Sequence, residues 1–526
     1  MRTAKALWDV ENQKIHKSSE RICHFMKTKT LSLLLAVIML SAAFVSCKST
    51  SVPKESSGTS NVSETDPEIL AVNSYVDELA AQSNFNGATF TYVGEGGENA
   101  EHEEETGNIE NDALYQRQRE LEEKFGITWQ SKKVNGYSDE GTVNVAAFVK
   151  EAVMSGLKDY DLVYGNPITV GAVLFVENCL VDVSQFGTID LDNEWWNSSL
   201  RDKYSFAGKL YFLTGSIVTS YFNDPSCLLF NKDVAENFNI EEPYDLVKSG
   251  EWTFDRMFEL ASAIPLNTNG NGVYRYGKPN GLAILFANGG TITYFDDDGI
   301  PYIPTSLPVE LSDIADKFSA VMGDNSQCAH EKNLNSMGGT QESFPKKYGY
   351  KNEAEMFVDQ RILFLFATTG YASRLREKET EFGILPVPKK DTSQDRYYSY
   401  GDNWSSLFVY VPRCARDIEM TDVITEAMAA LGHKYIKPAY YEKILKGRST
   451  YDAASREMID IVFESKVYDM ADMYGDGNIN TPGLFISSIK YAIDDDSSSF
   501  ATDYFVYGRT ANIQIKNLLK QIESFE

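Results

Sequence analysis

The sequence predicts an α/β protein that is large enough to build two hydrophobic cores. The chain has 526 residues, which exceeds the size of one typical domain. Residues 88–166 alternate between strand and helix patterns, an order typical of a mostly parallel sheet. Residues 206–264 follow as strand, loop, strand, helix, turn and helix, and they form the centre of the chain.

Charge and composition limit the partners that the chain can have. There are 49 Lys and Arg residues against 76 Asp and Glu residues, which gives a net charge of −27. Such a chain repels nucleic acid and anionic membrane surfaces. The hydrophobic share of 43% is that of an ordinary globular protein, so global disorder is not expected. We therefore expect neutral or cationic small molecules, or other proteins, as partners, and no nucleic acid.

The N-terminal segment has the pattern of a secretion signal. Residues 1–25 are polar and aperiodic, and we interpret them as an upstream extension with translation starting at Met26. A basic start then precedes an apolar segment at residues 31–40 and small residues before Cys47. That apolar segment is short for a membrane span. The pattern predicts a signal peptide at residues 26–46 and an extracytoplasmic location for the rest.

A lipid anchor is expected at the cleavage point. Residues 44–47 (FVSC) resemble the lipobox of bacterial lipoproteins, in which the cysteine carries lipid and begins the mature chain, although Phe44 stands where leucine is usual. An ordinary signal peptide and an uncleaved anchor are the alternatives. Residues 48–67 are rich in Ser, Thr, Pro and Gly, a composition that favours a flexible tether. Residues 47–85 would thus comprise a lipid-anchored tether and a leading helix on the outer face of the membrane.

The first part of the mature chain alternates helices and strands. The apolar periods predict helices at residues 69–79, 115–125 and 145–154, and strands at residues 88–93, 127–130 and 160–165. In parallel sheets, ligands bind beyond the carboxyl ends of the strands. The loop that follows Tyr164 is therefore a candidate part of a binding site.

The central stretch carries a family resemblance. Residues 208–215 (GKLYFLTG), 228–238 (LLFNKDVAENF) and 243–261 (PYDLVKSGEWTFDRMFELA) resemble the centre of the family 1 extracellular solute-binding proteins, the lipid-anchored sugar receptors of ABC importers. Further ordered motifs extend the resemblance from Ala88 to the C-terminus. It implies an α/β, two-lobed periplasmic-binding-protein-like fold (type II) with hinge strands between the lobes.

The resemblance also implies the boundaries of the lobes. Lobe 1 would comprise residues 86–222 and 389–440, and lobe 2 residues 231–381 and 445–526. Residues 223–230 and 382–388 would be the hinge segments. Closure of the two lobes on a ligand that contacts both would then be the binding mechanism.

Six ligand-binding residues follow from the resemblance. Asp224 lies seven residues before Asn231 of the Asn-Lys pair, where the family commonly places an acidic contact. A carboxylate there can accept two strong hydrogen bonds from sugar hydroxyls. A turn aspartate, a core tyrosine and a core tryptophan are the structural alternatives for Asp224, Tyr164 and Trp404. The full set is Asp224, Tyr164, Asn166, Gly370, Tyr371 and Trp404.

Other conspicuous residues receive structural interpretations. Trp195 and Trp196 could stack on a sugar, but we favour packing on their own lobe. His102 lies among glutamates without the HExxH spacing, so no metal is expected there. The four cysteines of the mature chain after Cys47 are well separated, and we expect buried free thiols or one or two disulfides: Cys179, Cys227, Cys328 and Cys414. No cofactor is expected.

These observations predict a binding protein and not an enzyme. The chain would act as a monomer, capture an oligosaccharide or sugar derivative between its lobes, and deliver it to the permease subunits of an ABC importer. An exported glycan hydrolase is one alternative, since a suitable pair of carboxylates would suffice for that chemistry. A surface scaffold that uses the same fold without tight small-molecule binding is the other.

Overall fold

The computed structural model describes residues 66–526, apart from residues 97, 99–103, 135–143, 271, 331–343, 376, 377, 379, 446–452, 472–482 and 524–526. The expected extension, the signal peptide, the lipidated Cys47, most of the tether and His102 lie outside the described residues. Residues 58–526 form one compact unit. Within the described part of the chain, no helix is long and apolar enough to cross a membrane.

A four-stranded sheet organises the N-terminal part of this unit. Its strand order is β14-β3-β1-β2, and β14 alone is antiparallel to its neighbour. The strands are β1 (Ala88–Gly94), β2 (Ile127–Lys133), β3 (Leu162–Gly165) and β14 (Phe408–Tyr410). Parallel strands need crossover connections, which here are α3 (Ile109–Phe125) and α4 (Asn144–Ser155). The alternating pattern of residues 88–166 is thus confirmed as a mostly parallel sheet.

A second sheet of five strands follows in the chain. Its order is β10-β7-β11-β6-β12, and the strand β6 is antiparallel to both of its neighbours. The strands are β6 (Ser226–Asn231), β7 (Tyr274–Gly277), β10 (Cys328–Ala329), β11 (Ile362–Thr368) and β12 (Phe382–Leu385). Every residue of β6 is buried, as expected for a short apolar strand inside a core. Among the residues that the structure describes, the buried side chains of both sheets join into one continuous hydrophobic cluster, so the two separate cores expected from the chain length are not observed.

Helices accompany the second sheet along the chain, and asparagine or threonine side chains cap the N-termini of four of them. They include α7 (Lys232–Phe238), α8 (Tyr244–Lys248), α9 (Phe254–Ala261), α10 (Gly281–Ala287), α11 (Val309–Met322), α13 (Glu353–Val358) and α14 (Thr369–Leu375). The hydroxyl of Thr253 accepts a hydrogen bond from the Arg256 amide at 3.3 Å. This bond satisfies an otherwise unpaired amide of the first turn of α9, so Thr253 is the N-cap of that helix. Its position directly before the helical pattern of residues 254–264 predicts this role.

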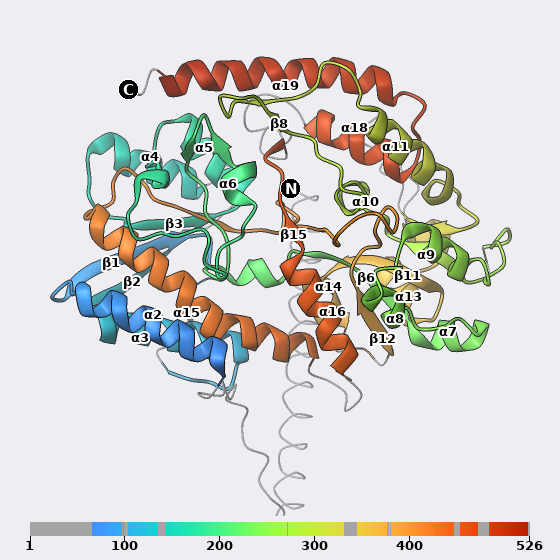
Figure 1. The fold of residues 1–526 in the computed structure, drawn as a ribbon, viewed down its shortest axis with the longest axis horizontal. Helices are drawn as coiled ribbons and strands as arrows, with labels where there is room; N and C mark the ends of the chain where they lie inside the picture. Colours follow the sequence, from blue (N-terminus) through green and yellow to red (C-terminus); the bar gives the residue numbers. More distant parts are fainter. Residues whose placement is uncertain are drawn as a thin grey trace, which may run out of the picture. The chain divides into compact units, whose positions relative to one another are not determined.

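Long helices complete both halves (Figure 1). Helix α15 (Ile418–Leu445) packs against α2 (Pro67–Gln82) and α3, and α19 (Phe500–Glu523) packs against α18 (Gly483–Asp494). From residue 415 onward the sequence predicts helices, including one at residues 455–467. That helix ends earlier in the structure, because α16 (Ala453–Glu464) gives way to β15 (Lys466–Val467). This strand pairs in parallel with β13 (Ser399–Tyr400). That part of the sequence-based prediction was wrong.

Helix α15 approaches the first half of the chain closely at Gly432. A Cβ atom at Gly432 would lie 2.0 Å from the carbonyl oxygen of Ser216, a distance that real Cβ contacts do not reach. Only glycine therefore allows this approach without a shift of backbone.

All four described cysteines are buried and free: Cys179, Cys227, Cys328 and Cys414. Of the two possibilities that the sequence leaves open for them, free thiols are the one observed.

Candidate functional site

Asp224, the expected ligand contact, is a buried structural residue. It lies just before β6, where the chain passes from the first sheet to the second, and its exposed fraction is 0%. Its Oδ1 lies 2.7 Å from the Lys466 Nζ, and its Oδ2 accepts hydrogen bonds from the Ser406 and Tyr468 hydroxyls. With both oxygens occupied and no contact with solvent, this carboxylate does not face a ligand in the observed conformation.

Lys466 supplies the positive charge in this buried network. Its ammonium also donates to the Tyr221 carbonyl oxygen and lies 3.2 Å from the centroid of the Tyr221 ring. Burial lowers the pKa of Lys466 to about 8, against the attraction of Asp224. Burial likewise raises the pKa of Asp224, and its donors oppose this shift. No local pattern in the sequence indicates this partner.

Three other expected ligand contacts are also engaged within the protein. Tyr164 is fully buried in the first sheet. The Asn166 amide oxygen caps the turn after β3, while its nitrogen donates to the carbonyl oxygens of Asn403 and Trp404. Gly370 donates its amide hydrogen to the Asn223 carbonyl oxygen at 2.9 Å, and a Cβ atom at Gly370 would make a tight contact of 3.0 Å with Asn223. In this conformation these residues hold the loops around the crossing together.

Trp195 and Trp196 have the structural role that the sequence analysis favours. Their indole nitrogens donate to the two carboxylate oxygens of Glu426 at 2.9 and 2.8 Å. Both tryptophans are nearly fully buried, so they are not stacking surfaces for a sugar. Burial raises the pKa of Glu426, and the two indole donors oppose that shift. The sequence offers no signal for this carboxylate.

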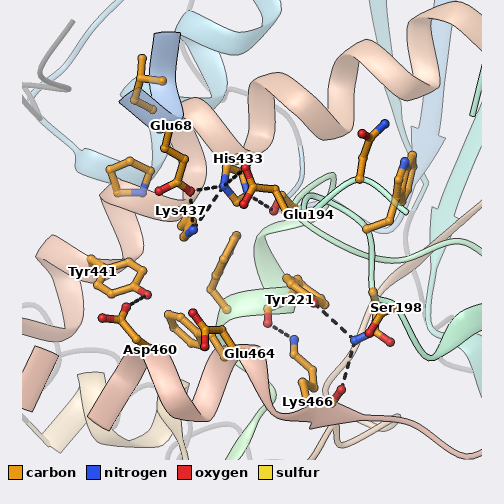
Figure 2. A pocket seen from close by; sticks show the side chains of 18 of the residues that line it. Glu68, Glu194, Ser198, Tyr221, His433, Lys437, Tyr441, Asp460, Glu464 and Lys466 are labelled. Atoms are coloured by element: carbon orange, nitrogen blue, oxygen red, sulfur yellow. Dashed lines mark hydrogen bonds and ion pairs between the residues drawn. The ribbon is translucent and has the colours of Figure 1, made fainter. Parts of the chain in front are cut away.

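A large cavity between described residues has a volume of about 1070 Å³ (Figure 2). Its walls come from the start of α2, the loop at residues 191–198, α15, α16 and β15. Many of its polar side chains already bond to one another, as Tyr441 does to Asp460.

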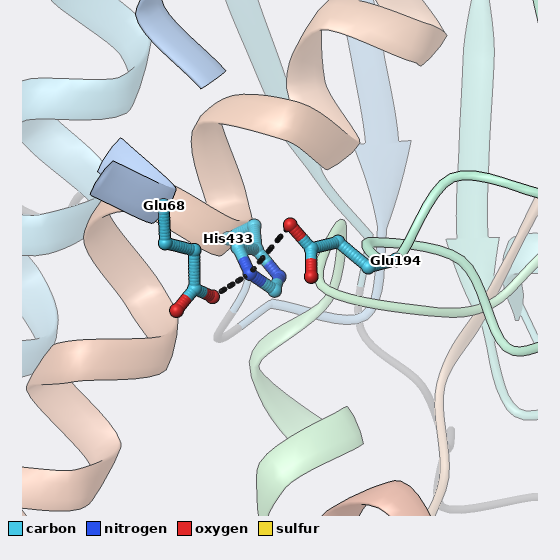
Figure 3. A group of neighbouring side chains, drawn as sticks. All are labelled: Glu68, Glu194 and His433. Carbon is cyan, nitrogen blue, oxygen red and sulfur yellow. Dashed lines mark hydrogen bonds and ion pairs between the residues drawn. The ribbon is translucent and has the colours of Figure 1, made fainter. Parts of the chain in front are cut away.

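In this cavity, three side chains that could ligate a metal ion lie close together, but a lysine ammonium group lies among them (Figure 3). Oxygen and nitrogen atoms of Glu68, Glu194 and His433 lie within 4.8 Å of one another. However, the Lys437 Nζ lies 2.6 Å from Glu68 Oε1 and 3.2 Å from His433 Nε2. An ammonium group therefore takes the position that a metal cation would need. The hydrogen bond from His433, aided by Lys437, lowers the pKa of Glu68 to about 2 although burial opposes it.

A smaller cavity has a volume of about 570 Å³ and lies at the carboxyl ends of β7 and β11. Lys278 and Pro279 follow β7 directly. Thr368 is the last residue of β11, and Tyr371 follows in α14. Asp402 and Ser405, from the loop between β13 and β14, border the opposite side. Tyr371 is thus the one expected contact that lines this cavity. Trp404 lies between two lining residues in the sequence and is 53% exposed.

Charged residues that the sequence does not single out as ligand contacts line the same cavity. The Lys278 Nζ lies 4.1 Å from the centroid of the Tyr371 ring, and the Arg374 Cζ lies 5.3 Å from it. Lys490 and Asp494 come from α18. Burial raises the pKa of Asp494 to about 7, and the charge of Lys490 opposes the shift. The position of Lys278 directly after a strand was a usable signal.

Comparison with known proteins identifies the fold. No family model and no curated protein matches the chain. Among solved structures, a sugar transporter from Rhizobium etli in an open conformation shares 13% identity and has a TM-score of 0.52, covering 82% of this chain and 99% of its own. A cyclo/maltodextrin-binding protein in complex with maltotetraose shares 12% identity and has a TM-score of 0.50, covering 84% and 98%. This chain has the two-lobed solute-binding-protein fold.

The solute-binding-protein fold gives the 570 Å³ cavity its significance. Strand β11, the loops after β7 and β10, and helices α13, α14 and α18 supply most of its wall. Asp402 and Ser405, which lead into β14 of the first sheet, supply the rest. The cavity is therefore bordered by segments attached to both sheets, at the strand ends where ligands of α/β proteins bind.

Proposed function

We propose that the protein captures a carbohydrate in the 570 Å³ cavity and delivers it to an ABC importer. The observation that carries the proposal is the position of this cavity, at the carboxyl ends of β7 and β11 and against the loop that leads into β14. A cyclo/maltodextrin-binding protein and a protein described as a sugar transporter have this fold, which supports a sugar as the ligand.

The side chains of the cavity suit a carbohydrate. Tyr371 offers an aromatic ring for the apolar face of a sugar, and burial raises its hydroxyl pKa to about 12, so the ring stays neutral. Thr368, Asn280 and Ser487 add neutral polar groups for hydroxyls. Trp404 stands exposed beside Ser405 and would cover the ligand when the lobes close.

The protein would act at the membrane surface, through closure of its two lobes. Lipidation of Cys47 would hold the protein on the outer face of the membrane, with residues 48–65 as a tether. The ligand would stabilise a closed form by contacting both lobes, and permease subunits would bind that form. The protein would act as a monomer without catalysis.

Binding is tested by calorimetry and thermal shift of the purified protein against a panel of mono- and oligosaccharides. A ligand that binds the native state raises the melting temperature through mass action. Tyr371→Ala and Trp404→Ala should each weaken binding at least tenfold. Matched controls are Tyr302→Ala and Phe505→Ala, since these aromatic residues are exposed and do not line the cavity. Binding to no saccharide, or release of shortened glycan products, would overturn the proposal.

A further inference from the structure

The strongest unexplained feature of the 570 Å³ cavity is a group of three cations: Lys278, Arg374 and Lys490. They come from three separate elements, the loop after β7, helix α14 and helix α18. Two of them flank Tyr371, with Lys278 Nζ 4.1 Å and Arg374 Cζ 5.3 Å from the ring centroid. Four acidic residues line the same cavity, so cations and carboxylates are mixed along its wall: Glu353, Asp402, Asp494 and Asp495.

None of these three cations forms an ion pair within 4 Å with a carboxylate among the described residues, in contrast to several basic residues elsewhere on the surface. Lys317, for example, pairs with Asp255 at 2.7 Å, and Arg256 pairs with Glu241 at 2.6 Å. Lys490 precedes Asp494 by one helical turn, the spacing at which side chains meet, yet no ion pair forms between them. The Lys278 side chain is exposed to solvent. Desolvation by its neighbours lowers its pKa; the charges of Glu353 and Asp402 oppose this shift, and those of Arg374 and Lys490 add to it.

The acidic residues of the cavity do not supply the missing partners. Asp402 accepts hydrogen bonds from the Trp404 amide and the Ser405 hydroxyl, so its charge serves its own loop. Glu353 lies in the first turn of α13, where the helix dipole stabilises a negative charge. Asp494 has a pKa of about 7 and is therefore partly protonated near neutral pH. Lys278 and Arg374 thus flank the Tyr371 ring, and none of the four acidic residues that line the cavity forms an ion pair within 4 Å with them or with Lys490.

We propose that the carbohydrate recognised in this cavity is anionic and carries carboxylate or sulfate groups that the three cations Lys278, Arg374 and Lys490 bind. The inference rests on the proposed function and narrows its substrate class. Arg374 presents a planar fork that matches either kind of oxyanion, and the two lysines add point charges. The ligand supplies the negative charges that the chain itself does not pair with these cations.

The test compares tetrasaccharides of equal length by calorimetry: tetragalacturonate as the carboxylated probe, a sulfated carrageenan tetrasaccharide, and maltotetraose as the neutral probe. At least one anionic probe should bind at least tenfold more tightly than maltotetraose, and its affinity should fall as salt rises. Binding of only one anionic probe identifies the group as carboxylate or sulfate.

Two variants assign the effect to the cations. Lys278→Gln and Lys490→Gln should each reduce the affinity for the anionic probe about tenfold and make that affinity less dependent on salt. Lys317→Gln, which removes a lysine outside the cavity, serves as the matched control and should change nothing. Preferential binding of maltotetraose, or unchanged binding by both variants, would overturn this inference while the proposed sugar-binding function stands. Binding to none of the three probes nor to the wider saccharide panel would overturn both.

Discussion

The Lys466 ammonium lies 2.7 Å from the Asp224 carboxylate, and both side chains have an exposed fraction of 0%. Asp224 marks the crossing into β6, whereas Lys466 begins β15, which pairs with β13. The ion pair therefore ties the crossing segment to a strand from the C-terminal part of the chain. A residue expected to hold ligand instead holds the crossing.

Removing one member of this pair should strongly destabilise the protein. Lys466→Met leaves the Asp224 carboxylate buried with only hydroxyl donors, and we expect a loss of about 3–5 kcal/mol in the free energy of unfolding. The double variant Asp224→Leu with Lys466→Met should recover roughly half of that loss, because no uncompensated charge remains. Urea unfolding measures both.

The exposed pair between Arg201 and Asp192 offers the matched control. It has a similar separation, 2.9 Å, but its side chains are 56% and 77% exposed. Asp192→Asn should therefore change the stability by less than about 0.5 kcal/mol. A Lys466→Met variant as stable as this control would show that the buried pair does not secure the crossing.

The interactions of Glu68 in α2 with His433 and Lys437 in α15 should make the stability of the protein depend on pH in the acid range. Its pKa is lowered from 4.5 to about 2, so the folded state favours the ionised form. The resulting stabilisation is present above the unfolded-state pKa of 4.5 and is lost as pH falls through about 2. Because the side chain is 39% exposed, screening reduces the contribution to about 1 kcal/mol.

Glu68→Gln should accordingly destabilise the protein at pH 6 and have little effect at pH 2, as measured by the melting temperature across that range. Glu78→Gln, on an exposed position of the same helix, is the control and should have little effect at either pH. An equal loss for Glu68→Gln at both values would exclude the charge as the cause.

Asp494 should show the opposite pH dependence. Burial raises its pKa from 3.8 to about 7, so the folded state favours the protonated form. The stability should fall as pH rises between these two values, because the ionised form is the less favourable one. Asp494→Asn imitates the protonated acid and should stabilise the protein by about 1 kcal/mol at pH 8 but not at pH 4.

The exposed Asp313 of α11 supplies the control for that measurement. Asp313→Asn should leave the melting temperature unchanged at both pH values. If Asp494→Asn also leaves the melting temperature unchanged at both pH values, ionisation of Asp494 does not destabilise the folded protein.

Gly432 should resist replacement although it lies inside a helix. Alanine is normally the better helix former by about 1 kcal/mol, but here its Cβ would meet the Ser216 carbonyl oxygen at 2.0 Å. Gly432→Ala should therefore cost about 2–3 kcal/mol through displacement of α15. At Gly187 a Cβ would meet nothing within 4 Å, so Gly187→Ala should be nearly neutral in the same unfolding experiment.

The sequence predicted those parts of the fold that local patterns determine. The strand at residues 88–93 and the capping role of Thr253 depend on neighbouring residues, and both are observed. The short strand at residues 466–467 was missed because two residues have no measurable period, and the apolar residues before them continue a helical pattern.

The candidate site was harder to predict because its residues are assembled from distant segments. The position of Asp224 at the crossing was apparent, but its partner Lys466 lies 242 residues away, and nothing near Asp224 indicates that its charge is neutralised. Tyr371 was predicted from the family resemblance, as the aromatic residue in the loop that follows a buried strand. Lys490 lies on a helix that brings it to the same cavity only through packing of α18 against α10.

The partners of Asp224 lie far from it in the sequence. The crossing segment is synthesised early, but its charged and hydroxyl partners arrive only at Ser406, Lys466 and Tyr468, as many as 244 residues later. Contacts of such sequence separation form late because the intervening chain must first be ordered. While the ribosome is still adding α15, Asp224 has neither Lys466 nor Tyr468 to meet it. A chain truncated before Lys466 would therefore leave the Asp224 carboxylate with the Ser406 hydroxyl alone, and removal of the C-terminal part should destabilise the crossing segment far from the cut.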